Sequence, residues 1–280
     1  MPVKGNITVT VIVDNNALPG FAAEHGFSLW IETSGMRMLF DLGLGPAFRP
    51  NVLQLGIDLR TMDTLVLSHG HYDHTGSVRE ALEAAPHARV CLHRGAFTDR
   101  WSIRGGTAKP TSMPESSRNA IKALREEQVC YAIGPTELAP GVWVTGPVPR
   151  LREFEDPGGP FFLDTEGKIP DPIEDDMSLW IETPEGLVVM AGCCHSGIIN
   201  TLEFITRTTG EHRIAAVMGG LHLSSASQER ILRTAGELKR LGVRRVVTSH
   251  CTGEAATEQF RELLACPVEG SLAGMRLTLP

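Results

Sequence analysis

The six residues from His69 to His74 (HGHYDH) contain four side chains that bind metal ions well. Neutral imidazoles and a carboxylate are the ligands that suit zinc, iron or manganese. His69 and His71, two residues apart, can hold one ion, and Asp73 and His74 can hold a second. The chain has only ten histidines in 280 residues, so three at this spacing seldom arise by chance. We therefore expect a metal site rather than a histidine-rich surface turn.

One local cluster cannot complete two coordination spheres, so further ligands must come from the second half of the chain. The candidates stand beside predicted strands: Asp175 or Asp176, His195, His222 and His250. Of these we favour His195 and His250, and we keep Asp176 and His222 as alternatives.

Other polar residues receive smaller roles. Asp41, at the end of a predicted strand, is expected to orient a ligand histidine by accepting its second N–H. Cys193 and Cys251 are candidate soft ligands, although small buried residues account for them equally well. The remaining histidines are expected to be ordinary structural or surface residues: His25, His87, His93 and His212.

The segment 94–118 is rich in glycine, serine, proline and basic residues and lacks clear periodicity. We expect a long loop or lid there, because long irregular segments in compact domains are usually functional or disordered. Guanidinium groups bind phosphate in bidentate fashion. The segment is therefore expected to bind a small anionic substrate through Arg100, Arg104 and Lys109.

Hydrophobic periodicity predicts the elements that position these residues. In the first half we expect strands at 7–13, 27–33, 36–41, 63–67 and 89–93 and a helix at 77–85. In the second half we expect strands at 178–183, 187–192, 214–218, 243–248 and 275–279, with helices at 199–208, 225–241 and 254–264. Such an order suits two packed sheets with helices outside them.

A short repeat relates the two halves. Ser-Leu-Trp-Ile-Glu-Thr occurs at 28–33 and again at 178–183, and each copy precedes a glycine-containing turn and a second apolar strand. We interpret residues 1–280 as one domain of two related halves, about 1–150 and 151–280.

Composition indicates an ordinary globular chain, with 42% hydrophobic and 21% charged residues. A net charge of −7 gives no sign of a nucleic-acid-binding protein. No apolar run approaches the ~20 residues that cross a bilayer, and the N-terminal residues are too polar for a secretory signal. Six cysteines without a C-x-x-C pair indicate neither a disulfide framework nor a zinc finger. We expect a cytoplasmic protein without a membrane partner, and the sequence leaves homo-oligomer formation open.

These motifs resemble the metallo-β-lactamase superfamily: His-x-His-x-Asp-His after a strand, and a late strand that ends in histidine. More narrowly, AEHGFSLWIET, DLG, LSHGHYDHTG, GCCHSGI, GGLHL and SHCTG resemble a subgroup labelled 7,8-dihydropterin-6-methyl-4-(β-D-ribofuranosyl)aminobenzene-5′-phosphate synthase. This resemblance implies that residues 14–16 and 23–28 line the cleft of the site. The resemblance implies an α/β (α+β) fold, a four-layer αββα sandwich of two mixed β-sheets flanked by helices. It also implies phosphodiester or cyclic-phosphate chemistry on a pterin-like nucleotide. Two positions depart from the superfamily: Asp176 stands roughly in place of a usual histidine, and Cys193 replaces the bridging aspartate.

We therefore expect a metal-dependent hydrolase that activates water on one or two divalent ions, zinc first, with iron or manganese as alternatives. The expected ligand sets are His69, His71 and His195 for one ion, and Asp73, His74 and His250 for the other. Asp73 is also expected to accept a proton from the water.

Three other functions stay open: a lactone or thioester hydrolase of the same fold, a metal-dependent oxidoreductase, and a metal-stabilised binding protein without turnover. Flavin-linked di-iron members of the superfamily carry glutamate where this chain has His71, which argues against the oxidoreductase.

Overall fold

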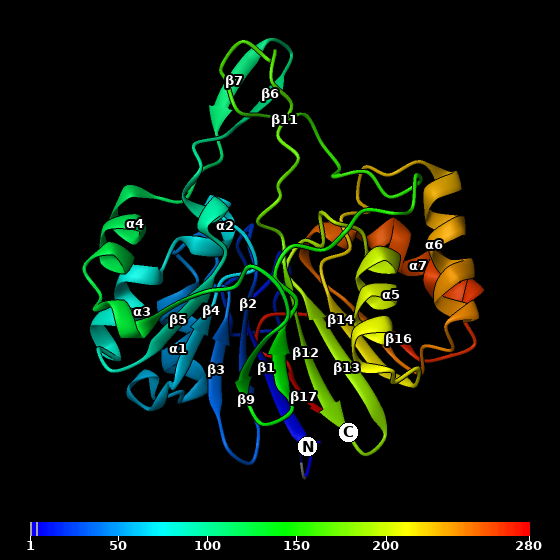
Figure 1. Cartoon of the computed structure of the whole chain (residues 1–280), viewed down its shortest axis with the longest axis horizontal. Coiled ribbons are helices and arrows are strands. Elements are labelled where there is room, and N and C mark those ends of the chain that lie inside the picture. Colours follow the sequence, from blue (N-terminus) through cyan, green and yellow to red (C-terminus); the bar gives the residue numbers. More distant parts are fainter. Residues whose placement is uncertain (1, 4) are drawn as a thin grey trace.

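Two seven-stranded β-sheets pack face to face in the computed structural model, which describes residues 2–3 and 5–280. Helices cover the outer face of each sheet, so the layers run αββα (Figure 1). The predicted four-layer sandwich of two mixed sheets is confirmed. In the described part of the chain, no helix has the length and hydrophobicity needed to cross a membrane.

The first sheet has the order β17-β1-β2-β3-β4-β5-β8. Its strands are β1 (Ile7–Val13), β2 (Ser28–Glu32), β3 (Arg37–Phe40), β4 (Thr64–Val66), β5 (Arg89–Leu92), β8 (Val129–Tyr131) and β17 (Arg276–Leu279). Strands β3, β4, β5 and β8 are parallel, and β17, β1, β2 and β3 are antiparallel. The outer face of this sheet, away from the second sheet, is covered by the helices α1 (Phe48–Leu55), α3 (Val78–Ala84) and α4 (Glu115–Lys122) (Figure 1).

The second sheet has the order β16-β15-β14-β13-β12-β10-β9. Its strands are β9 (Thr136–Ala139), β10 (Val142–Val144), β12 (Ser178–Thr183), β13 (Gly186–Ala191), β14 (Ile214–Gly219), β15 (Val246–Thr248) and β16 (Val268–Gly270). Strands β13 to β16 are parallel. The outer layer contains α5 (Ile198–Thr209), α6 (Gln228–Arg240) and α7 (Glu254–Leu263).

The repeated hexapeptide occupies equivalent places, β2 and β12, in the two sheets. Successive side chains of a strand point to opposite faces. The leucine and isoleucine of each copy therefore enter the core between the sheets. Trp30 and Trp180 point the other way and pack in the cores under the helices. One pattern of alternation thus builds all three hydrophobic layers.

The boundary between the halves differs from the prediction. The chain leaves the first sheet after β8 and enters the second at β9, so the crossover lies at residues 132–135 rather than near 150. The last strand, β17, then returns to the first sheet and pairs with β1.

The segment 94–118 is also more regular than predicted. It contains a hairpin of β6 (Trp101–Arg104) and β7 (Thr107–Pro110), and α4 begins within it. Gly105 and Gly106 both have positive φ, at 57° and 74°, which suits a two-residue hairpin turn. Strand β11 (Phe161–Phe162) pairs with β6, and the three strands form an arm that stands away from the two sheets (Figure 1). The sequence does not reveal β6 and β7, because strands of four residues beside glycines are too short to show an alternating hydrophobic pattern.

Candidate metal centre

The predicted ligands meet at one end of the sandwich. His69 to His74 follow β4, His195 follows β13, His222 follows β14 and His250 follows β15. In the first sheet β4 is parallel to both of its neighbours, and in the second sheet β13, β14 and β15 are parallel to one another, so the residues that follow the strands of each sheet emerge at the same edge. Asp73 and His74 lie on the short helix α2 (Tyr72–Thr75), and His71 immediately precedes that helix.

The first group of potential ligands is His69, His71 and His195, each offering one atom within 4.8 Å of the others. All three side chains are buried. His71 Nε2 and His195 Nε2 have no hydrogen-bond partner in the described part of the chain. A buried polar atom without a partner costs roughly 1–3 kcal/mol, and coordination of a metal ion would satisfy both. The donor set therefore fits a metal.

Burial is the largest influence on these imidazoles, and it lowers the pKa of His69, His71 and His195 well below 6.5. Neighbouring imidazoles lower these pKa values further, because a second positive charge nearby is unfavourable. The three rings are consequently neutral, which is the form that binds a metal.

The second group joins Asp73 and His250 to His25. Asp73 Oδ2 lies 3.0 Å from His25 Nε2, 3.4 Å from His250 Nε2 and 3.9 Å from His74 Nε2. Burial opposes the charge of Asp73, but the imidazoles of His74, His25 and His250 outweigh it and lower its pKa well below 3.8. The sequence predicts an ordinary structural or surface role for His25, but the structure places it in this group of potential ligands.

His25 reaches the centre through backbone pairing that no local spacing reveals. The backbone N–H of Phe27 donates to the carbonyl of Asp73, 3.3 Å away. A Cβ at Gly26 would stand 2.7 Å from that same carbonyl oxygen, so only glycine allows the two segments to approach this closely.

His74 joins a different group from the one expected. Its Nε2 belongs with His69 and Cys193. The carboxylate of Asp41 lies 2.7 Å from His74 Nδ1, the position required for the orienting role predicted for it. Asp41 also accepts hydrogen bonds from the backbone N–H and the hydroxyl of Ser68. Burial opposes protonation of His74, but Asp41 and Asp73 outweigh it and raise the pKa of His74 to about 9.

The more distant histidines are held in the same manner. His250 Nδ1 lies 2.9 Å from Asn15 Oδ1, and His195 Nδ1 lies 2.7 Å from the carbonyl oxygen of Pro157. An acceptor on Nδ1 leaves Nε2 directed to the centre. Asn15 and Pro157 escape prediction as orienting groups because each is far in sequence from the histidine that it contacts.

Backbone strain gathers around the centre. Among the described residues, five non-glycine residues have positive φ, and four of them are Asp41, Cys194, His222 and His250, at 45° to 58°. Such conformations cost roughly 1–3 kcal/mol each and are concentrated at functional sites. The strain indicates that, in these turns, the position of the side chain matters more than the conformational energy of the backbone.

The two alternative ligands have different positions. Asp176 contributes to none of the ligand groups in the described part of the chain. Its Oδ2 accepts a hydrogen bond from the backbone N–H of Ser196, so it holds the turn that carries His195. His222 is half-buried and forms a group with Cys193 and His195. The geometry supports His222, and not Asp176, as a ligand.

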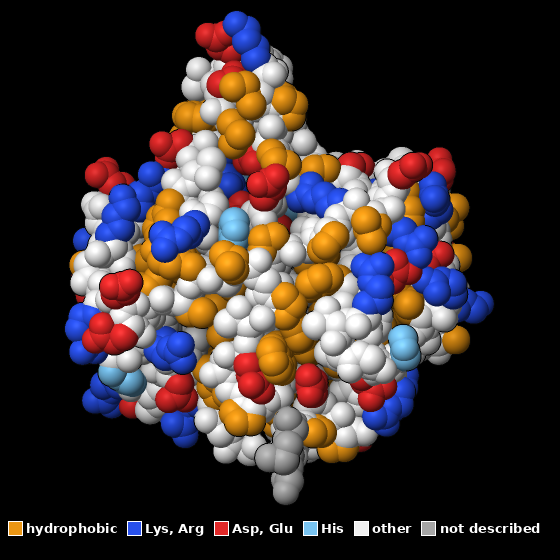
Figure 2. All heavy atoms as spheres, in the orientation of Figure 1, with side chains coloured by type: hydrophobic (Ala, Val, Ile, Leu, Met, Phe, Trp, Pro, Cys, Tyr) orange, Lys and Arg blue, Asp and Glu red, His pale blue; other side chains and the backbone are white. Residues whose placement is uncertain are grey.

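A cavity of about 700 Å³ opens onto the centre. Its wall includes His71 and Asp73 on the body of the protein, and Arg104 and Lys109 on the arm. Both cations are exposed. In the space-filling view the arm rises above the body, with hydrophobic side chains along its length (Figure 2). Phe161 of β11, also in the wall, lies with its ring centroid 4.8 Å from that of His71.

The structure corrects the role predicted for Arg100. Its side chain is buried, with 1% of the residue exposed, and therefore does not face the cavity. Its Nη2 lies 2.8 Å from Asp175 Oδ1 and its Nε 3.1 Å from Asp171 Oδ2. The second oxygen of Asp175 accepts the backbone N–H of Gly70, between His69 and His71, at 2.7 Å. Through Asp175, Arg100 therefore links the base of the arm to residues 69–71, which we call the ligand loop.

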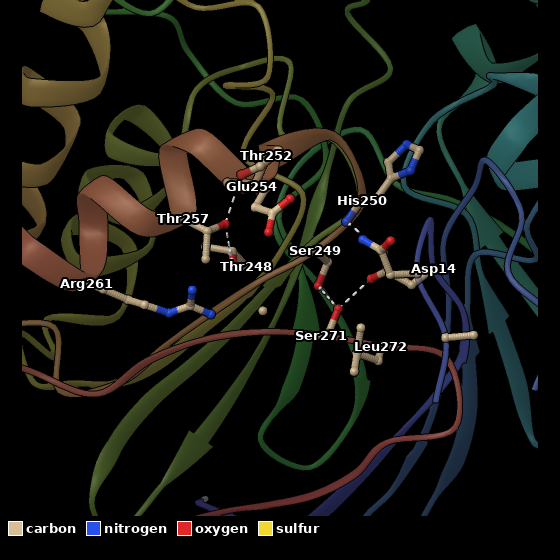
Figure 3. Close-up of a pocket in the computed structure, with 14 residues that line it drawn as sticks. Asp14, Thr248, Ser249, His250, Thr252, Glu254, Thr257, Arg261, Ser271 and Leu272 are labelled. Carbon is tan, nitrogen blue, oxygen red and sulfur yellow. Dashed lines mark hydrogen bonds between the residues drawn. The ribbon is translucent and has the colours of Figure 1, made fainter. Parts of the chain in front are cut away.

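A second cavity, of about 480 Å³, lies behind His250 (Figure 3). The ring of His250 is directed away from the hydroxyl groups of Ser249 and Ser271 that line it. Ser271 donates to Asp14, and Asp14 accepts the backbone N–H of His250 at 3.2 Å. These contacts support the backbone of the ligand from behind.

Comparison with known proteins identifies the family. A model described as the metallo-beta-lactamase superfamily matches residues 23–250, and the chain belongs to that superfamily. It is similar to Tm1679, a metal-dependent hydrolase of the beta-lactamase superfamily, whose crystal structure has a TM-score of 0.83 and 32% identity and covers 97% of this chain and 98% of that one.

Two relatives from Methanocaldococcus jannaschii extend the comparison. The chain is 29% identical over 252 residues to its 7,8-dihydropterin-6-methyl-4-(beta-D-ribofuranosyl)-aminobenzene-5'-phosphate synthase, covering 86% of this chain and 85% of the relative. An uncharacterized protein of that organism is 30% identical over 257 residues, covering 91% and 94%. The predicted resemblance to the superfamily and to this subgroup is confirmed.

Proposed function

We propose that this chain is a metal-dependent hydrolase that cleaves a phosphodiester or cyclic-phosphate bond in a small anionic molecule. One observation carries the proposal. The cavity of about 700 Å³ has potential metal ligands, His71 and Asp73, in one wall and two exposed cations, Arg104 and Lys109, in the other. A phosphate group bound by the cations would lie beside the metal centre.

The residues divide the work as follows. His69, His71 and His195 would hold one ion, and Asp73 and His250 a second, with His25 or His74. A bound zinc, iron or manganese ion supplies Lewis acidity and lowers the pKa of a coordinated water toward about 7. Asp73, ionised because of the surrounding imidazoles, would accept a proton from that water. Arg104 and Lys109 would bind and orient the phosphate.

The name of one relative supports this choice of substrate. The 29% identical relative is named for a dihydropterin that carries a 5′-phosphate. That relative is called a synthase, so a bond-forming reaction on a related phosphorylated compound is the second candidate function.

The experiment combines metal analysis with an activity screen. Protein purified without chelator is analysed for bound metal and assayed on bis-p-nitrophenyl phosphate, a cyclic nucleotide, a lactone and a thioester. We expect one to two ions per chain and turnover of the phosphate substrates. Absence of metal, even after incubation with zinc, iron or manganese, would contradict the proposal, and turnover of only the lactone or thioester would refute its substrate class.

Single substitutions test the ligand assignment. His195→Ala and His250→Ala are expected to lower metal content and activity together, because each removes a donor from a coordination sphere. His212→Ala is the matched control, since His212 is exposed and lies in the loop that precedes β14, at the opposite end of that strand from His222. Equal metal content in all three variants would show that the assignment is wrong.

A further inference from the structure

Cys193 has the most central position among the potential ligands. Its Sγ atom belongs to three of the five ligand groups found among the described residues. These groups are His69–His74–Cys193, Cys193–His195–His222 and Cys193–His250–Cys251. The side chain is 3% exposed, and Sγ lies 3.1 Å from His74 Nε2. The sulfur therefore stands between the histidines that follow β4 and those that follow β13, β14 and β15.

Cys251 brings a second sulfur to the same place. It follows the ligand His250, is buried, and lies in one group with His250 and Cys193. Its Sγ approaches the carbonyl oxygen of Cys193 to 3.7 Å. A Cβ at Gly220 would come within 2.6 Å of this sulfur. The glycine therefore leaves room for the sulfur between the turns after β13 and β14.

We propose that Cys193 coordinates the metal centre as a thiolate shared between its histidine groups, with Cys251 as a second sulfur ligand. The inference rests on the metal binding of the proposed function. On coordination, the sulfur–hydrogen bond breaks, the proton passes to solvent and the sulfur lone pair binds the metal. Thiolates favour zinc and softer ions, whereas manganese and magnesium favour oxygen ligands. The centre should therefore select zinc, cobalt or cadmium over manganese.

The neighbouring Cys194 provides a matched control within the same turn. It is also completely buried, yet its Sγ lies 3.6 Å from the hydroxyl of Thr201, and it joins no ligand group in the described part of the chain. A general effect of losing a buried thiol would appear in both cysteines, whereas loss of a ligand would appear in Cys193 alone.

Cobalt(II) spectroscopy of the full chain tests the inference without an activity assay. Metal-free protein is titrated with Co²⁺, and bound cobalt is quantified. A thiolate ligand gives an intense near-ultraviolet charge-transfer band, whereas histidine and carboxylate ligands give only weak visible bands. We expect this band in the wild-type protein and in Cys194→Ser, a smaller band in Cys251→Ser, and loss of most of it in Cys193→Ser.

Competition between metals gives a second measurement. Loss of a group that only orients a metal ligand weakens metal binding by about 10–100-fold. We therefore expect Cys193→Ser, which removes a ligand itself, to weaken Cd²⁺ binding by at least about tenfold. Binding of Mn²⁺ should change far less. Cys193→Asp should keep cobalt bound with most of the band lost, as in the serine variant, and it replaces that variant if the serine variant does not fold.

The outcomes separate this inference from the proposed function. Cobalt bound by the wild-type protein without a charge-transfer band would overturn the thiolate and leave the metal centre standing. Retention of the band in Cys193→Ser would equally overturn the role of Cys193. Failure of the wild-type protein to bind Co²⁺, Cd²⁺ or Mn²⁺ would overturn both the thiolate and the metal-dependent function.

Discussion

Replacing Asp175 with alanine should be among the most destabilising single changes at the edge of the metal centre. Both carboxylate oxygens are engaged, one with Arg100 at 2.8 Å and the other with the backbone N–H of Gly70 at 2.7 Å. Asp175 is 1% exposed and Arg100 is 1% exposed, so water cannot replace the lost partner. The substitution would leave a buried guanidinium with Asp171 as its remaining counter-ion.

The magnitude follows from these contacts. Removing one partner of a buried ion pair costs about 3–5 kcal/mol, and leaving a buried N–H without an acceptor costs about 1–3 kcal/mol. Because the two losses share one side chain they do not simply add, and we expect the free energy of unfolding to fall by about 3–5 kcal/mol. Asp175→Asn should lose less, since its amide oxygen can still accept the N–H of Gly70.

Urea unfolding of the metal-free protein at neutral pH measures this difference. Asp99→Ala is the control, because Asp99 pairs with Arg118 at 2.6 Å but its side chain is 63% exposed. Exposed ion pairs contribute about 0–1 kcal/mol. If Asp175→Ala lowered the free energy of unfolding no more than Asp99→Ala, the view that Asp175 and Arg100 anchor the ligand loop would be wrong.

Three further predictions address the cavity, a ligand and the response to pH. Arg104→Ala combined with Lys109→Ala should raise KM for a phosphorylated substrate well above its effect on a neutral ester; equal effects in steady-state kinetics would argue against phosphate recognition. Asn15→Ala should weaken metal binding by about 10–100-fold, because His250 loses the acceptor on Nδ1; unchanged affinity in a chelator competition would contradict this. Burial raises the pKa of Glu155 from 4.5 to about 7. The folded state therefore holds a proton that the unfolded state releases, so the contribution of Glu155 to stability should decline by about 3 kcal/mol as pH rises from about 4.5 through 7. Glu155→Gln should flatten this decline in denaturant unfolding at several pH values, and an unchanged slope would disprove the assignment.

The elements that could be predicted are those whose pattern is local. Strand β1 occupies the predicted range 7–13, and the two copies of the hexapeptide form β2 and β12. The cluster from His69 to His74 is contiguous, and the predicted His195 and His250 each follow a strand at the same edge. Periodicity and strand ends are sufficient to find such residues.

The residues that could not be predicted depend on contacts between distant segments. His25 reaches the centre because Phe27 pairs with the backbone of Asp73. Nothing in the sequence distinguishes Arg100 from a surface arginine. It can be buried because folding places Asp171 and Asp175 beside it. The arm escaped because two of its strands are four residues long and its third comes from residues 161–162.

The pairing of β17 with β1 has a consequence for how the protein is made. Strand β1 is synthesised first among the strands, yet its neighbour in the sheet, β17, comprises residues 276–279. On the ribosome, one edge of β1 therefore keeps its backbone N–H and C=O groups unpaired until residues 276–279 have emerged. Open strand edges promote association between chains. We expect translation that stalls before residue 276 to release chains that aggregate, and mild cooling during expression to improve the yield of folded protein.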